Sequence, residues 1–197
     1  EAQEINETRR QLSEIREALL GYAAATGRLP PPADPAKASN DPTAGLIEEG
    51  RVSGAVPWVT LGLSETDPWG QRFTYRVRLE FSDPVIPANQ PPTCVPNPLP
   101  ALAGFALCSE GNISVTDGAV IIANKLPAIV VSHGPNGLGG YRSDGTQVAG
   151  AAGDELENAN NNVNFVSRNQ SANFDDEVIW LPLFNLMSRM IAAGRLP

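Results

Sequence analysis

The chain opens with EAQEINETRRQLSEIREALLGYAAAT, residues 1–26, in which apolar positions return at steps of three and four. This spacing places them in one stripe along a helix, and the charged residues between them fall on the other face. Gly27 and the prolines at 30–32 end the helix, because glycine adopts the left-handed closing conformation and proline cannot continue a helix. The sequence therefore predicts a long amphipathic helix that needs a packing partner. Its seam consists of Ile5, Leu12, Ile15, Leu19 and Tyr22, with Thr8 and Thr26 in register.

The start of this helix carries no capping signal. No Ser, Thr, Asp or Asn precedes the periodic positions, and charged helix-forming residues begin at Glu1. Helices usually begin at such a capping residue. We therefore expect the helix to continue upstream of residue 1. The alternative is an ordinary helix at the edge of a globular domain, trimmed by a few residues.

Length and composition bound the classes of protein to consider. A chain of 197 residues with 42% hydrophobic residues suffices for one domain, which we place at 1–197. The formal net charge of -8 disfavours a nucleic-acid or anionic-membrane surface, because the field of the protein repels phosphates at long range. The sequence has no apolar run of membrane-spanning length and no signal-peptide pattern at its start.

Two cysteines, Cys94 and Cys108, stand in a proline-rich stretch. They are too few for a zinc site of four thiolates, and a pair of this kind in an exported protein usually forms a disulfide. The alternative is a pair of free thiols in a cytosolic protein.

An antiparallel sheet is predicted after a long loop. Residues 27–70 are rich in proline and glycine, with a short helical turn expected at 46–49 and Trp58 as an anchor. Strict alternation over 73–79 predicts a strand with one buried face, covered most economically by the first helix. Further strands are expected at 104–108, 113–115, 119–123, 128–132, 163–166 and 174–181, within a sheet region 71–181, and a last helix at 183–193 within the segment 182–197. The predicted fold class is α+β, a long N-terminal helix packed on an antiparallel sheet, with extended loops and a short C-terminal helix.

Few residues suggest catalysis. His133 is the one histidine, and no nucleophile or carboxylate stands beside it in a recognisable arrangement, so we interpret it as a hydrogen-bonding residue of a loop. The glycine-rich run 134–140 lacks the lysine and hydroxyl residue of a phosphate-binding loop. We therefore expect no enzyme and no catalytic residue.

The order of three short motifs resembles the type IV pilin-like family, in particular the pseudopilins of type II secretion systems and related minor pilins. Asp67-Pro68-Trp69-Gly70 resembles the family turn that leads into the first strand. The run 132–137, Ser-His-Gly-Pro-Asn-Gly, is similar to the family's Ser-Leu-Gly-Ala-Asp-Gly, and 175–178 is similar to its Asp-Asp-Ile before the final strand.

The resemblance implies a structural subunit of a periplasmic pseudopilus or type IV pilus that supports protein secretion or pilus biogenesis. Its partners would be other pilin or pseudopilin subunits, contacted through the helix 1–26. It also implies a processed leader and a hydrophobic half-helix upstream that anchors the subunit in the inner membrane, with the rest in a periplasmic or extracellular filament. The fold implied is pilin-like, and no nucleic acid is expected as a partner.

The resemblance further implies a calcium ion in the late loop, where Asn136 occupies the position of a family aspartate. Calcium binds six to eight oxygen atoms. The alternative is a set of solvated carboxylates without an ion. The candidate ligands are Asn136, Asp144, Asp154, Asp175 and Asp176.

Two other functions stay open at the level of sequence. Arg72, Arg76 and Arg78 would share the solvent-facing side of the strand at 73–79, where they could bind DNA or a surface at a filament tip. An exported hydrolase is the third hypothesis, although neither a nucleophile motif nor a zinc-binding histidine pair supports it.

Overall fold

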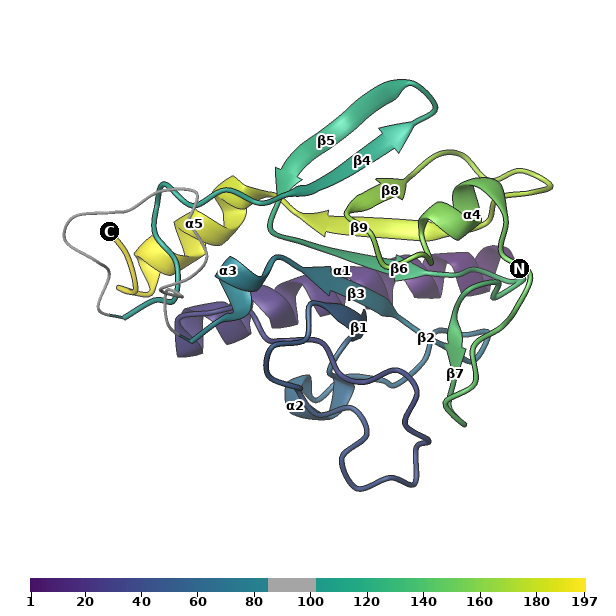
Figure 1. Ribbon diagram of the computed structural model, residues 1–197, viewed down its shortest axis with the longest axis horizontal. Coiled ribbons are helices and arrows are strands. Elements are labelled where there is room, and N and C mark those ends of the chain that lie inside the picture. The colour runs from purple at the N-terminus through teal and green to yellow at the C-terminus, as the bar shows by residue number, and fades with distance from the viewer. Residues whose placement is uncertain (85–101) are drawn as a thin grey trace.

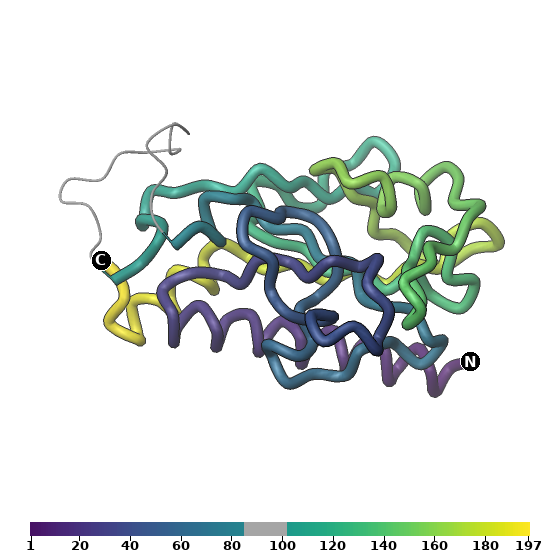
Figure 2. The backbone as a smooth tube through the Cα atoms, turned by 60° about the horizontal axis from the view of Figure 1, so that its bottom comes forward, coloured from purple at the N-terminus to yellow at the C-terminus, as the bar shows by residue number. Residues whose placement is uncertain are grey.

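A long helix runs along the long axis of the molecule in the computed structural model, which describes residues 1–84 and 102–197 (Figures 1 and 2). This helix, α1 (Ala2–Thr26), ends at Gly27, where φ is 89° and the backbone N–H donates a hydrogen bond to the carbonyl of Ala23. The predicted helix and its glycine stop are confirmed. Among the helices of the described ranges, none combines the length and the apolar character that crossing a membrane requires.

The main sheet has four antiparallel strands in the order β1-β3-β6-β9. The predicted strand at 128–132 lies inside this sheet, and every one of its residues is buried because packed layers cover both of its faces. The α+β arrangement expected from the sequence is therefore confirmed. The strands are β1 (Ser53–Ala55), β3 (Thr74–Val77), β6 (Ala128–Ser132) and β9 (Glu177–Leu181).

The largest core lies between α1 and one face of the main sheet. Leu12, Ile15 and Leu19 of the seam are at most 3% exposed and pack in one cluster with Tyr75 and Val77 of β3. The ends of the seam are less covered: Ile5 and Tyr22 are half-buried, and Thr26 is exposed. The amphipathic pattern thus marks the face by which α1 packs on its own domain.

A second, smaller sheet covers the opposite face of the main sheet, which the sequence did not anticipate. Its order is β5-β4-β8, and β4 runs parallel to β8. Its inward side chains pack against Ile129 and Val131 of β6. The hairpin of β4 and β5 projects from the body of the molecule in Figure 1 and exposes Val120 and Ile121. The three strands are β4 (Ile113–Asp117), β5 (Val120–Leu126) and β8 (Asn164–Val166).

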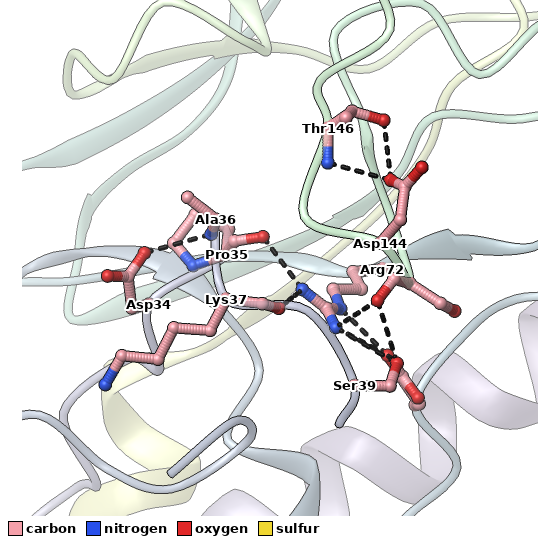
Figure 3. A network of polar contacts seen from close by, with 10 residues as sticks. Asp34, Pro35, Ala36, Lys37, Ser39, Arg72, Asp144 and Thr146 are labelled. Atoms are coloured by element: carbon pink, nitrogen blue, oxygen red, sulfur yellow. Dashed lines mark hydrogen bonds and ion pairs between the residues drawn. The ribbon is translucent and has the colours of Figure 1, made fainter. Parts of the chain in front are cut away.

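A buried arginine holds the long loop 27–70 to the body. Arg72 lies in β2 (Gln71–Arg72), which pairs with β7 (Tyr141–Arg142), and its side chain is 1% exposed. Its guanidinium donates hydrogen bonds to the carbonyl oxygens of Pro35 and Lys37 and to the carboxylate of Glu65 (Figure 3). The prediction that Arg72 faces solvent is wrong, because the folded loop covers it. Trp58, in α2 (Trp58–Leu61), is buried beneath this loop as predicted.

Several predicted boundaries need correction. The strand expected at 73–79 ends at Val77, because the chain turns into α3 (Leu79–Ser82) and buries Phe81 in the main core. Residues 104–108 form no strand, since the backbone at Gly104 packs against the carbonyl of Asp83. The helical turn expected at 46–49 is absent there, and the short helix α2 forms later in the loop instead. Cys108 is disulfide-bonded, and Cys94 lies outside the described residues.

Three arginines tie α1 to the C-terminal part of the chain. Arg9 binds the carboxylate of Glu177 at the start of β9 with two hydrogen bonds, of 3.1 and 3.0 Å. Arg189, on α5 (Leu183–Ala192), pairs with Glu17 on α1. Arg195 donates to the carbonyl oxygens of Ala24 and Ala25, which lack helical partners at the end of α1. The predicted C-terminal helix is thus docked on α1.

Candidate functional site

The strongest candidate site forms where β6 ends and β9 begins. The two strands are antiparallel neighbours with Ser132 opposite Glu177, so the residues that follow β6 lie beside those that precede β9. The short helix α4 (Gly153–Glu157) adds Glu155 from a third segment. One carboxylate oxygen from each of Glu155, Asp175 and Asp176 lies within 4.8 Å of the others. We call these three residues the acidic cluster.

Asparagine side chains orient the cluster. The side-chain amide of Asn136 donates to Glu155 at 2.8 Å, and its backbone N–H donates to Oδ2 of Asp175 at 3.0 Å. Asn158 donates to Oδ2 of Asp176 at 2.8 Å and is itself fixed by two hydrogen bonds to the backbone of Val166. The remaining oxygens, Oδ1 of Asp175 and Oδ1 of Asp176, are buried and have no hydrogen-bond partner among the residues that the structure describes.

The cluster concentrates negative charge in a poorly solvated place. Burial raises the pKa of Asp176 to about 8, and the charges of Glu155 and Asp175 add to this, against a hydrogen bond from Asn158. Burial also raises the pKa of Asp175 to about 6, with Glu155 contributing in the same direction and the N–H of Asn136 opposing it. A bound cation would relieve both the desolvation and the mutual repulsion.

His133 lies next to the cluster and is completely buried. Its Nε2 forms a hydrogen bond of 2.8 Å with the hydroxyl of Thr74, as expected for a residue with a hydrogen-bonding role. Its Nδ1 is 3.8 Å from Oδ1 of Asp176, which is too long for a hydrogen bond. Burial lowers the pKa of His133 to about 4, against a backbone hydrogen bond to Leu138, so the ring is neutral at pH 7.

One hydrogen bond joins the turn motif at 67–70 to the motif at 132–137. The hydroxyl of Ser132 donates to Oδ2 of Asp67 at 2.7 Å, while Oδ1 accepts from the backbone N–H groups of Trp69 and Gln71. Burial raises the pKa of Asp67, and these hydrogen bonds oppose the shift. The two segments of the family resemblance therefore touch, and Asp67 fixes the end of β6 from which the acidic cluster is built.

The structure brings together two of the five candidate calcium ligands, Asp175 and Asp176. Asn136 lies beside the cluster, but its amide group donates to Glu155 and its Oδ1 accepts from the N–H of Leu138. Asp144 caps its own turn through Thr146, and Asp154 pairs with Arg168 at 2.7 Å. The sequence did not indicate Glu155 as a ligand, because the five residues of α4 are too few to show a helical period.

The donor set fits a hard divalent cation. Carboxylate oxygens are the ligands that calcium prefers, and three carboxylates with two unpartnered oxygens leave room for backbone and water ligands. The buried Nδ1 of His133 is a further unpartnered atom directed toward Asp176. No acid–base pair with matched hydrogen bonds emerges here, since the ring of His133 does not hydrogen-bond to Asp176.

Comparison of the chain with models of known protein families, with curated proteins and with solved structures finds no match in any of the three.

Proposed function

We propose that this protein is a structural subunit of a filament of the pseudopilus or type IV pilus kind, and that it assembles through α1. The observation that carries the proposal is the one-sided packing of α1. Leu12, Ile15 and Leu19 are buried in the domain, whereas Ser13 and Glu17 are exposed. A helix of 25 residues with one free face suits bundling with the helices of neighbouring subunits.

The motifs quoted above support the same proposal. They occur in the family order, and two of them are in contact through Asp67 and Ser132. In this proposal the subunit is held at the inner membrane by a segment upstream of α1 and projects into a periplasmic or extracellular filament. Its role is assembly in support of protein secretion or pilus biogenesis, without a catalytic step.

Photocrosslinking in the producing cell tests the proposal. The photoreactive amino acid p-benzoylphenylalanine replaces Ser13 on the free face of α1, and in a matched control it replaces Ala172, an exposed residue outside α1 in the loop before β9. We expect the probe at Ser13 to give adducts whose mass spectra contain the helical region of another pilin-like subunit or of a second copy. Irradiation of the Ala172 variant should give no such adduct. Absence of helix adducts from Ser13 in cells that assemble filaments would refute assembly through α1.

We propose in addition that the acidic cluster binds a divalent cation, with calcium as the first candidate. The supporting observation is the pair of buried, unpartnered oxygens on Asp175 and Asp176 beside Glu155. Such a cation would join α4 to the start of β9 and thereby order the loop between residues 133 and 176. Calorimetric titration of the chelator-treated protein with calcium tests this role, and binding heats no larger than those of a buffer blank would refute it.

A further inference from the structure

A cavity of about 620 Å³ lies between the loop 27–70 and the segment that leads into β8. It is formed by five stretches that are separated in the sequence, including residues of β1, β3 and β7. Its lining residues include Arg51, Ser53, Arg76, Tyr141 and Asn161. None of these takes part in the packing of α1 or in the acidic cluster.

Arg76 is the unusual residue of this cavity. It lies on β3 opposite Ser53, on the face that points away from the α1 core. Its Nη1 donates to the backbone oxygen of Asn161 at 2.5 Å, and its Nε is buried without a hydrogen-bond partner. Burial lowers the pKa of Arg76, and no acidic group within the described ranges forms an ion pair with it. The side chain of Arg76 is half-buried, and a partly buried guanidinium without a counterion is energetically unfavourable.

Two other arginines show what the guanidinium group binds in this chain. Arg9 presents Nε and Nη2 to the two carboxylate oxygens of Glu177, and Arg72 presents the same two nitrogens to a single oxygen, Oε1, of Glu65. This edge of the guanidinium matches the spacing of two carboxylate oxygens. In Arg76 the corresponding edge has no acceptor from residues 1–84 or 102–197.

The other charged groups around the cavity do not supply the missing counterion. Glu48 is paired with Arg51 at 3.2 Å, and Glu49 is paired with Arg28 at 2.6 Å. Arg51 also lines the cavity, and its charge is balanced by Glu48 and by Asp34 at 3.5 Å, although its Nε is buried without a hydrogen-bond partner among the described residues. The acids of the rim are therefore already neutralised, whereas Arg76 is not.

We propose that this cavity binds a carboxylate, with Arg76 as the cation and principal hydrogen-bond donor and the unpartnered Nε of Arg51 as a second donor. Tyr141 supplies an aromatic wall for the carbon atoms that carry the carboxylate. The carboxylate belongs either to a free small acid or to a glutamate side chain of a peptide, since both present the same two oxygens. This site is independent of filament assembly and of the cation at the acidic cluster.

NMR titration of the whole protein tests the proposal directly, with the ¹H–¹⁵N signals of the arginine Nε–H groups as the readout. The probes are glutarate, a blocked tripeptide with a central glutamate, and the same tripeptide with a central glutamine. We expect a saturable shift of the Arg76 signal with at least one of the two acids and none with the glutamine peptide. Saturation by glutarate alone identifies a small acid, and tighter binding of the glutamate peptide identifies a side chain.

Variants separate binding from structural effects. Arg76→Gln should weaken carboxylate binding by at least about tenfold. Arg76→Lys, which keeps the charge but not the two parallel N–H donors of the guanidinium, should weaken it less. Arg142→Gln removes the same charge from an exposed position one residue from Tyr141 and should leave the affinity unchanged. Because Arg76 has no ion pair to lose and donates one hydrogen bond, to Asn161, Arg76→Gln should melt only slightly below the parent protein while losing the ligand-induced rise in melting temperature. No shift of the Arg76 signal, or equal weakening by Arg76→Gln and Arg142→Gln, would overturn the proposal.

Discussion

The guanidinium carbon of Arg72 lies 4.6 Å from the centre of the Trp58 ring. This contact joins the first residues of the sheet region to the anchor of the long loop, and it is surrounded by hydrogen bonds to backbone oxygens of that loop (Figure 3). The loop thus folds around one cation, whose charge is balanced by Glu65. An arginine suits this position because its planar group can stack on a ring while all of its edges donate hydrogen bonds.

Replacement of Arg72 should unfold this loop. We expect Arg72→Met to lower the free energy of unfolding by about 3 kcal/mol or more, because Glu65 and several carbonyl oxygens lose their donor. Urea denaturation followed by the tryptophan fluorescence of the protein measures the effect. The control is Arg142→Met, which removes an exposed arginine and should change stability by no more than about 0.5 kcal/mol. Equal effects of the two changes would contradict the role of Arg72.

Loss of the Ser132 hydroxyl should leave a buried carboxylate oxygen without a donor. Ser132→Ala is therefore expected to destabilise the fold by about 1–3 kcal/mol. The same urea experiment on Ser188→Ala, at an exposed position of α5, provides the baseline for a serine change. In a double-mutant cycle with Asp67→Asn, the two effects should be clearly non-additive. Strict additivity would show that the Asp67–Ser132 bond contributes nothing.

Calcium affinity should depend on the residues that the structure brings together and not on all those that the sequence suggested. Asp176→Asn and Glu155→Gln should each weaken binding by at least about tenfold, because each removes one charged ligand. Asp144→Asn should leave the affinity unchanged, since Asp144 caps a separate turn. Titration calorimetry on chelator-treated protein distinguishes these cases. A larger loss from Asp144→Asn than from Asp176→Asn would place the ion elsewhere.

The pKa of Asp176 makes the metal-free protein less stable as the pH rises. Between 3.8 and about 8 the folded protein keeps a proton on Asp176 that the unfolded chain releases. Stability therefore falls through that interval, by up to about 1.4 kcal/mol per pH unit. His133 has the opposite effect on stability below pH 6.5. There the unfolded chain binds a proton at this residue, whereas the buried ring stays neutral until about pH 4.

Measurements between pH 6.5 and 8 consequently report the effect of Asp176 on stability without that of His133. Urea denaturation in the presence of a chelator should show declining stability across this interval, and Asp176→Asn should remove most of the decline. Saturating calcium should have the same effect in the parent protein, because the ion stabilises the ionised carboxylate. Parallel pH profiles for the parent and the Asp176→Asn variant would show that this carboxyl group is already ionised in the fold.

The periodicity of the sequence predicted which faces of the first helix and of the strand are buried. The three-and-four spacing of Leu12, Ile15 and Leu19 and the alternation of Tyr75 and Val77 identified the two faces that form the main core. Periodicity could not show what covers the other face of the strand. Arg72 and Arg76 both follow the solvent-facing pattern, but a folded loop covers the first completely and a cavity receives the second.

Only part of the acidic cluster could be predicted from the sequence, because one of its residues arrives through non-local packing. Asp175 and Asp176 stand next to a recognisable strand, so their position at its start could be inferred from the sequence. Glu155 reaches them only because α4 packs against β8 and thereby comes close to the start of β9, an arrangement without a local signal. Non-local packing of this kind also decided that 104–108 forms no strand.

The arginine contacts of α1 have a mechanical consequence. Arg9, Arg189 and Arg195 connect the helix to the C-terminal region near its beginning, its middle and its end. A tensile force along the helix axis would load these connections side by side, as shear, instead of peeling them apart in succession. Resistance to forced unfolding is set by the barrier that such contacts raise, so the molecule is built to bear load along α1.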